Sequence, residues 1–183
     1  RLDLVSSGLF TVEKRSMVKA SILKNGTSLT QYGLNDFVVS NGESHRMLIA
    51  EVYVDQNRVS EYKSDGLIIA TPTGSTAYSL SGNGPIISPE VKAFTLLPMF
   101  PHSLNARTLI TSQDKQIKLK VRGKSKAFLS MDSHDNLKVT SDQEVLIQKA
   151  NTELTLIHPI DHSFFSSCRT KLGWSLGNPK NTK

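Results

Sequence analysis

Short segments in which apolar and polar residues alternate recur along the chain, as expected for strands with one face in a hydrophobic core. Two faces can be read directly in one segment: Leu48, Ala50, Val52 and Val54 against Met47, Ile49, Glu51 and Tyr53. The same pattern recurs in four other segments: Asp36–Val39, Asn136–Val139, Glu144–Lys149 and Glu153–His158. Turn signals separate these segments: Asn25-Gly26, Asn41-Gly42, Arg122-Gly123 and Ser141-Asp142. This spacing predicts a mainly β fold, an antiparallel sandwich or barrel with a few short helices.

The densest basic run, Asp114–Lys126, has the same strand pattern. Its apolar and basic residues alternate: Ile117, Leu119 and Val121 between Lys118, Lys120 and Arg122. We interpret the cations as the solvated face of a strand rather than as a binding patch.

Two segments favour helices. Ser88-Pro89-Glu90 is typical of a helix start, with Pro98 ending the helix soon afterwards. The second segment, 161–174, has Asp161 as a possible N-cap and Gly173 as a terminator. Three apolar residues would share one face of this helix: Phe164, Cys168 and Leu172. The tail 175–183 is expected to be flexible.

The stretch Ser64–Tyr78, "SDGLIIATPTGSTAY", has a different character. An apolar strand, Leu67–Ala70, leads directly into six small, hydroxylated or turn-forming residues, Thr71–Thr76. A short helix over Thr76–Ser81, capped by Ser75 or Gly74 and ended by Gly82, is predicted to follow. A helix start presents backbone N–H groups that suit phosphate, ribose hydroxyls or a base edge. The same residues are equally compatible with a purely structural turn.

The composition of the chain excludes only a few classes of protein. The 183 residues carry 22 Lys and Arg against 16 Asp and Glu, and the net charge is +6. The cations are scattered and lack aromatic interleaving, so we expect no nucleic-acid partner. Cys168 is the only cysteine, which favours a reducing, cytoplasmic compartment. No apolar run approaches the roughly 20 residues of a membrane span, and we expect no membrane association.

Several sequence motifs of known chemical function are absent from the chain. No lysine follows Gly74, as a phosphate-binding P-loop requires, and Gly82-Asn83-Gly84-Pro85 lacks the third glycine of a dinucleotide-binding turn. No nucleophile elbow is present. His158 and His162 are four residues apart, but Pro159 intervenes, and we expect no metal site.

The segment "DGLIIATPTGSTAYSLSGNGPIISP" closely resembles the signature of the NAD kinases. Other motifs match that family in the same order: "YGLNDFVV", "MLIAEVYVD", "LLPMFPHSLNARTLI", "SMDSHDNL", "LIHPIDHSFF" and "RTKLGW". The resemblance runs from about Glu13 to Trp174 and is greatest to the bacterial enzymes.

This resemblance implies transfer of the γ-phosphate of ATP, or of polyphosphate, to the 2′-hydroxyl of the adenosine ribose of NAD, giving NADP. A divalent cation such as Mg²⁺ would accompany ATP. The family combines an N-terminal α/β domain with a β-rich C-terminal domain. Its members form homodimers or homotetramers whose NAD sites are shared between subunits.

One family motif is missing from this sequence. Gly-Gly-Asp-Gly-Thr, which supplies the Asp proposed as general base, does not occur, because Ser64 precedes Asp65-Gly66. We therefore expect residues 1–160 to form the NAD-binding domain and 161–174 a helix that packs on an absent α/β domain, with no catalytic residue in this chain. The missing motif leaves a non-catalytic NAD(P)-binding module as an alternative. A related lipid kinase of the diacylglycerol or sphingosine type is another.

The resemblance also implies roles for individual residues. Asn35 matches the residue that reads the adenine edge, and Asp36 matches the carboxylate that accepts ribose hydroxyls. Lys63 and Asp65 match positions that meet the NAD of an adjacent subunit, and Arg46 and His134 match further binding positions. The loop and its helix supply the remaining residues of the expected NAD site: Thr73, Thr76, Ala77, Tyr78, Ser79, Leu80 and Ser81.

Overall fold

The computed structural model describes residues 2–24, 26–42, 47–123 and 127–173. The elements in chain order are α1 (Leu2–Ser6), β1 (Phe10–Lys24), β2 (Thr27–Gly33), β3 (Asp36–Asn41), β4 (Leu48–Val54), β5 (Asn57–Ser64), β6 (Gly66–Ala70), the 3₁₀ turn η1 (Gly74–Thr76), α2 (Tyr78–Ser81), β7 (Ala93–Met99), β8 (Leu109–Ser112), β9 (Ile117–Arg122), β10 (Ala127–Met131), β11 (His134–Val139), β12 (Glu144–Pro159) and α3 (Phe164–Leu172).

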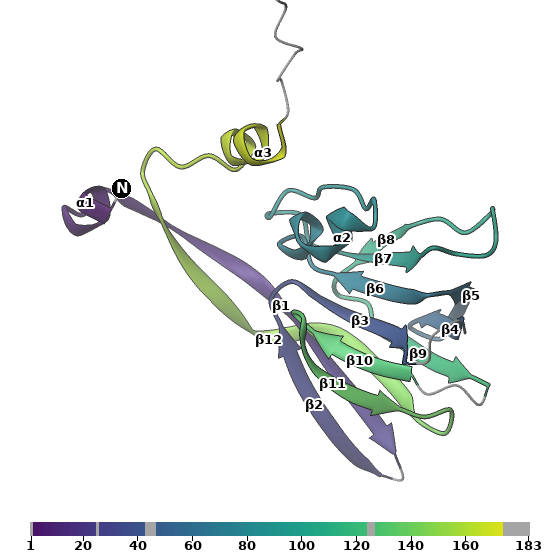
Figure 1. Cartoon of the computed structure of the whole chain (residues 1–183). Coiled ribbons are helices and arrows are strands. Elements are labelled where there is room, and N and C mark those ends of the chain that lie inside the picture. The colour runs from purple at the N-terminus through teal and green to yellow at the C-terminus, as the bar shows by residue number, and fades with distance from the viewer. Residues whose placement is uncertain (1, 25, 43–46, 124–126, 174–183) are drawn as a thin grey trace, which may run out of the picture. The chain divides into compact units, whose positions relative to one another are not determined.

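The strands form two six-stranded antiparallel sheets, which confirms the mainly β prediction (Figure 1). One sheet has the order β2-β1-β12-β9-β4-β5, and the other has the order β11-β10-β3-β6-β7-β8. In the second sheet β3 pairs with β6, and β6 with β7, so that the start of β3 lies beside the end of β6. This adjacency brings the "ND" motif and the small-residue loop together.

The main core lies between the two sheets and follows the predicted alternation. Every second residue of β4 and β9 is buried: Leu48, Ala50, Val52, Ile117, Leu119 and Val121. The basic residues of β9 lie on its other face, where Lys120 pairs with Glu144 at 2.6 Å and Arg122 with Glu51 at 2.7 Å. Both cations form salt bridges on the face of the strand opposite to the core, with Arg122 exposed and Lys120 half-buried.

A second, smaller apolar cluster lies on the other face of β3, β6 and β7. Its buried members are Val38, Ile68, Ala70 and Leu97. The end of α2 covers this cluster, because a Cβ placed on Gly82 would lie 2.7 Å from Leu97 and 3.7 Å from Ile68 (Figure 1). All five residues of β6 are consequently buried, which explains its unbroken apolar sequence.

Two local predictions were wrong. The expected helix after Ser88 is a turn followed by β7, six of whose seven residues are buried. A short apolar run is compatible with either element, and pairing with β6 decides for the strand. The segments Glu144–Lys149 and Glu153–His158 belong to one strand, β12, since neither Gly nor Pro interrupts the chain between them.

The described residues divide into two compact units, one from the ranges 2–14 and 155–173 and the other from within 15–154, and the two long strands β1 and β12 contribute to both. In the smaller unit, Nε2 of His158 lies 2.9 Å from Glu13, and the rings of His158 and His162 stack at 4.0 Å.

The predicted C-terminal helix is present as α3, in the smaller unit. Its N-cap is Ser163 and not Asp161, since the Ser163 hydroxyl accepts the N–H of Ser166. Cys168 is buried, and Gly173 ends the helix in the left-handed conformation. Across the described residues, no helix has the length and apolarity needed to cross a bilayer.

Candidate functional site

The site begins at the entry to β3, where every backbone polar group of Leu34, Asn35 and Asp36 is hydrogen-bonded. The Oδ2 atom of Asp132 accepts the N–H of Leu34 at 2.8 Å. Its Oδ1 atom accepts the N–H of Asn35 at 2.8 Å and that of Asp36 at 3.0 Å. On the carbonyl side, Thr71 donates its hydroxyl to Leu34 at 2.6 Å and its N–H to Asn35 at 2.9 Å. The N–H of Asp132 donates to the carbonyl of Asp36 at 3.1 Å, so two residues fix the whole tripeptide.

Gly74 allows the small-residue loop to approach this tripeptide closely. A Cβ at position 74 would lie 2.0 Å from the carbonyl oxygen of Asn35 and 2.4 Å from its carbonyl carbon. Both neighbours are backbone atoms, which cannot move aside as the end of a side chain can. The glycine of "TPTGSTAY" therefore serves a contact between two backbones rather than a ligand directly.

The predicted helix after the loop is present but is divided at Ala77. Gly74–Thr76 forms a 3₁₀ turn, and Tyr78–Ser81 forms a single α-helical turn. The expected cap by Ser75 or Gly74 is wrong: Thr73 precedes the 3₁₀ turn, and neither segment has a side-chain cap. The Ser75 hydroxyl instead donates to the carbonyl of Pro72 at 2.6 Å and accepts the N–H of Ile87 at 3.0 Å, which anchors the loop internally.

The carboxylate of Asp36 accepts a backbone hydrogen bond from Tyr78, the first residue of α2. The start of this helical turn is therefore satisfied by an anion of the protein itself. That arrangement disfavours a phosphate at the same amide. It favours a ligand that donates hydrogen bonds to a carboxylate, as sugar hydroxyls do.

Asp36 is also electrostatically unusual. Only 2% of the residue is exposed. The pKa of its carboxyl is raised from 3.8 to about 6: burial is the largest cause, the nearby charge of Asp132 acts in the same direction, and the hydrogen bond from Tyr78 opposes the shift. The group is therefore mostly ionised at pH 7.5, and it takes up a proton under mildly acidic conditions.

Two residues of this region were missed by the sequence analysis. Asp132 lies in the turn after β10, and Arg15 reaches the loop from β1, donating from Nη1 to the Thr73 hydroxyl at 3.2 Å. Arg15 is only 8% exposed and brings a positive charge to the loop. The sequence signal for Asp132 is its place in the family motif "SMDSHDNL", two residues before His134, whereas nothing local distinguishes Arg15.

The outer side of α2 opens into a cleft of about 480 Å³. Tyr78, Ser81 and Asn83 line one side of it, and Pro98–Pro101 line the other. Tyr78 is 42% exposed, so its ring is accessible to a ligand. Of the other expected residues, Thr76 is exposed, Thr73, Ala77 and Leu80 are half-buried, and Ser79 is fully buried.

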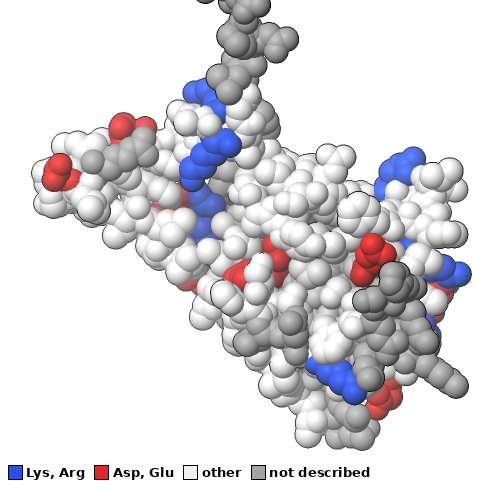
Figure 2. All heavy atoms as spheres, viewed as in Figure 1, with Lys and Arg blue, Asp and Glu red and all other residues white. Residues whose placement is uncertain are grey.

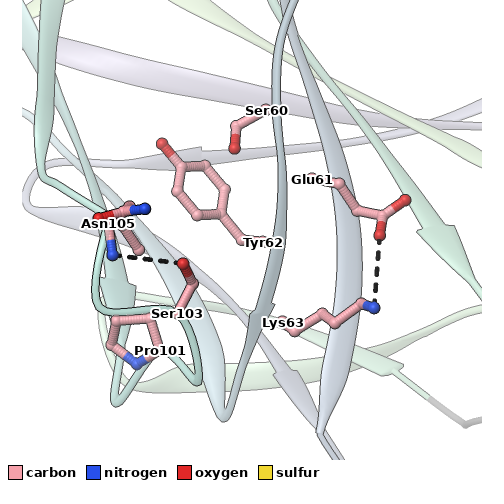
Figure 3. Close-up of a pocket in the computed structure, with 8 residues that line it drawn as sticks. Ser60, Glu61, Tyr62, Lys63, Pro101, Ser103 and Asn105 are labelled. Carbon is pink, nitrogen blue, oxygen red and sulfur yellow. Dashed lines mark hydrogen bonds and ion pairs between the residues drawn. The ribbon is translucent and has the colours of Figure 1, made fainter.

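Lys63 and Asp65 lie at the end of β5 and in the corner after it, in a different place from the Asn35 loop. Lys63 is among the residues that line a small cleft of about 140 Å³, and its Nζ atom lies 4.0 Å from Glu61. In Figure 3 the side chain of Tyr62, rather than that of Lys63, points toward Ser103 and Asn105. Asp65 is exposed.

The last two residues expected in the NAD site, His134 and Arg46, add little to its geometry. His134 is exposed at the start of β11, two residues after Asp132. Arg46 lies outside the described residues. On the face shown in Figure 2, Lys and Arg side chains are interspersed with Asp and Glu.

The fold and this loop define a β-sandwich domain with a fixed polar tripeptide beside a glycine-containing loop. Residues 34–159 match the family model described as the ATP-NAD kinase C-terminal domain. The match covers more than half of the chain, and the chain belongs to this family. The matched residues include the Asn35 loop, Asp132 and Tyr78, but not Arg15.

Two bacterial NAD kinases are similar to most of this chain. The chain is 40% identical over 178 residues to the NAD kinase of Chromohalobacter salexigens, covering 96% of this chain and 61% of that protein. It is 40% identical over 173 residues to the NAD kinase of Cellvibrio japonicus, covering 93% of this chain and 58% of that protein. The chain thus spans about three fifths of the length of these relatives.

Solved structures show the same fold. A crystal structure of yeast NADH kinase complexed with NADH superposes with a TM-score of 0.88 at 25% identity, covering 96% of this chain and 52% of that one. The NAD kinase from Archaeoglobus fulgidus in complex with ATP superposes with a TM-score of 0.72 at 24% identity, covering 86% and 59%. The second similarity is evidence for the fold alone.

Proposed function

We propose that the protein containing this domain is an NAD kinase, which transfers the γ-phosphate of ATP to the 2′-hydroxyl of the adenosine ribose of NAD. In this proposal, the chain supplies most of the NAD site. The observation that carries the proposal is the buried Asp36 carboxylate, held beside the "TPTGSTAY" loop in a chain of the NAD kinase family. The NADH-bound yeast relative supports a dinucleotide as the ligand.

The roles of the chain's own residues follow from their chemistry. The ionised Asp36 accepts hydrogen bonds from ribose hydroxyls and so orients the hydroxyl that is to be phosphorylated. Asn35 offers both a donor and an acceptor to the adenine edge. Tyr78 presents an aromatic face at the open cleft, where a base or nicotinamide ring can stack. Together they supply positioning, which is a large part of catalysis in phosphoryl transfer.

Donor binding and proton removal are assigned to residues outside this chain. The Gly-Gly-Asp-Gly-Thr motif is absent from the sequence. Among the described residues, no three His, Cys, Asp or Glu side chains gather as a metal site requires. These residues do not fit a divalent cation, so a Mg²⁺ ion that accompanies ATP would be held by the phosphates and by another part of the protein. The chain alone is expected to bind NAD without turning it over.

We further propose a cytoplasmic homodimer or homotetramer in which Lys63 and Asp65 act on the NAD of a neighbouring subunit. Their separation from the Asn35 loop supports this arrangement. Mixing Lys63→Ala subunits with Asp36→Asn subunits tests it. Recovered NADP formation in the mixed oligomer supports shared sites, and additive loss of activity contradicts them.

The main test is NADP formation by the full-length protein with NAD, ATP and Mg²⁺. The 183-residue chain serves as the matched control, which should bind NAD in calorimetry and form no NADP. NAD binding by both proteins without any product would favour the non-catalytic module. Phosphorylation of diacylglycerol or sphingosine in place of NAD would favour a lipid kinase.

A further inference from the structure

Asp132 holds an unusual position in the turn between β10 and β11. Its backbone is left-handed, with φ of 45°, which lets the side chain fold back over the start of β3. The neighbouring pair Met131 and Phe37 is in register in the β3–β10 ladder, so the turn begins directly beside the Asn35 loop. A carboxylate at this point meets three successive backbone N–H groups, 34–36, at 2.8, 2.8 and 3.0 Å.

Three successive amides that converge on one anion form a concave site of the kind that binds phosphates and other anions. Here the anion is a side chain of the same domain, so the concavity is filled from within. A carboxylate suits it because both of its oxygens accept hydrogen bonds, whereas an Asn amide offers one acceptor and would direct a donor at another N–H.

The arrangement places two carboxylates close together. The charge of Asp132 raises the pKa of Asp36, which is unfavourable for two ionised acids at neutral pH. Around Asp36 lie the Asp132 carboxylate in the β10–β11 turn and the Tyr78 amide of α2; Arg15 of β1 contacts the adjacent loop through Thr73. The backbone hydrogen bonds of Asp132 end at the residues whose side chains face the ligand in the proposed site.

We propose that Asp132 is a positioning residue for nucleotide recognition, whose carboxylate fixes the backbone of Leu34–Asp36 so that Asn35 and Asp36 are presented to the ligand in one conformation. This inference rests on the proposed NAD site. Asp132 acts through the tripeptide and does not itself contact NAD. Its charge also adds to the effect of burial on Asp36, and so raises the pH at which that carboxylate is ready to accept hydrogen bonds.

The experiment compares wild type, Asp132→Asn and the matched control Asp114→Asn in the full-length protein. Asp114 is a turn aspartate whose carboxylate accepts from Ser112 in its own turn. We expect Asp132→Asn to weaken NAD binding roughly tenfold in calorimetry at pH 7.5, since one amide loses its acceptor. We also expect the acid limb of binding to move to lower pH, because a charge that raises the pKa of Asp36 is gone. The control should change neither quantity.

Two measurements keep the test independent of folding and of the ligand. Carboxyl NMR titration should show a lower pKa for Asp36 in Asp132→Asn than in wild type, whether or not NAD binds. Hydrogen exchange of the wild-type protein without ligand should show that the amides of 34–36 are protected. This measurement does not depend on whether Asp132→Asn folds. An unchanged NAD affinity and acid limb in a folded Asp132→Asn, or rapid exchange at 34–36, would overturn the proposal. Protection and a shifted pKa without NAD binding in wild type would overturn only the proposed function.

Discussion

The carboxylate of Asp36 and the backbone N–H of Tyr78 form a hydrogen bond that joins the two motifs of the site, the start of β3 and the start of α2. The bond uses the first amide of the helical turn, so this turn presents a carboxylate rather than a bare helix end. The site is thereby suited to hydroxyl donors, and its behaviour depends on whether Asp36 is ionised.

NAD binding should weaken as the pH falls through 6. The pKa of Asp36 is raised to about 6, mainly by burial and then by Asp132, and a protonated acid loses acceptor capacity toward ribose hydroxyls. If only the ionised form binds well, affinity should fall roughly tenfold between pH 7.5 and pH 5. Calorimetry across this range measures the effect. Asp36→Asn is the control and should bind more weakly with no acid limb, and identical profiles for the two proteins would refute the role of Asp36.

The same variant should be more stable than wild type at neutral pH. The folded pKa of Asp36 lies above the ordinary value of 3.8, so the folded state holds its proton more tightly than the unfolded state does. The contribution of Asp36 to the free energy of unfolding therefore falls as the pH rises from about 4 to about 6. Asp36→Asn removes this loss, and we expect a gain of roughly 1 to 3 kcal/mol at pH 7.5 and little gain at pH 4.

Urea denaturation at the two pH values measures this difference. Asp55→Asn provides a control of opposite sign, because hydrogen bonds from Lys115 and from the N–H of Gln116 lower the pKa of Asp55. That variant should lose stability at pH 7.5. If Asp36→Asn is less stable than wild type at pH 7.5, the ionised carboxylate stabilises the folded state, and the prediction is wrong.

Gly74→Ala should separate the loop from the tripeptide. The added Cβ would lie 2.0 Å from the carbonyl oxygen of Asn35, and the backbone must move to accept it. We expect a loss of about 2 to 4 kcal/mol in the free energy of unfolding, as for other overpacked sites, together with loss of NAD affinity. Gly26→Ala is the control: its Cβ meets nothing within 4 Å, and its φ of 81° costs only about 1 to 2 kcal/mol. Normal NAD affinity in Gly74→Ala would show that the close approach is dispensable.

Local sequence patterns predicted the fold and part of the site. The alternation in β4 and β9 located the core because burial on one face of a strand imposes a period of two. The same rule fails for β7, which is buried on both faces and has no alternation to read. The resemblance identified "NDFVV" and "TPTGSTAY", and pairing of β3 with β6 places them side by side.

The parts that the sequence did not predict are long-range. Asp132 is 97 residues from Asn35, and Arg15 is 58 residues from Thr73. No periodicity or spacing in the sequence indicates such contacts, because they depend on which strands lie side by side in the folded sheets. Charged residues in turns and strands are usually solvated, and only the fold shows that these two support the loop.

Tyr78→Ala should weaken NAD binding without a matching loss of stability. The side chain is 42% exposed at the cleft formed with Pro98–Pro101, so the fold gains little from it, whereas a stacked base would lose roughly 1 to 3 kcal/mol. The variant should raise the Kd for NAD about 5- to 100-fold in calorimetry, with a melting temperature close to that of wild type. Tyr32→Ala is the matched control, because Tyr32 is 47% exposed on β2, away from the cleft, and should leave the Kd unchanged. Equal effects of the two substitutions would remove Tyr78 from the ligand site, and the cleft beside α2 would then need another occupant.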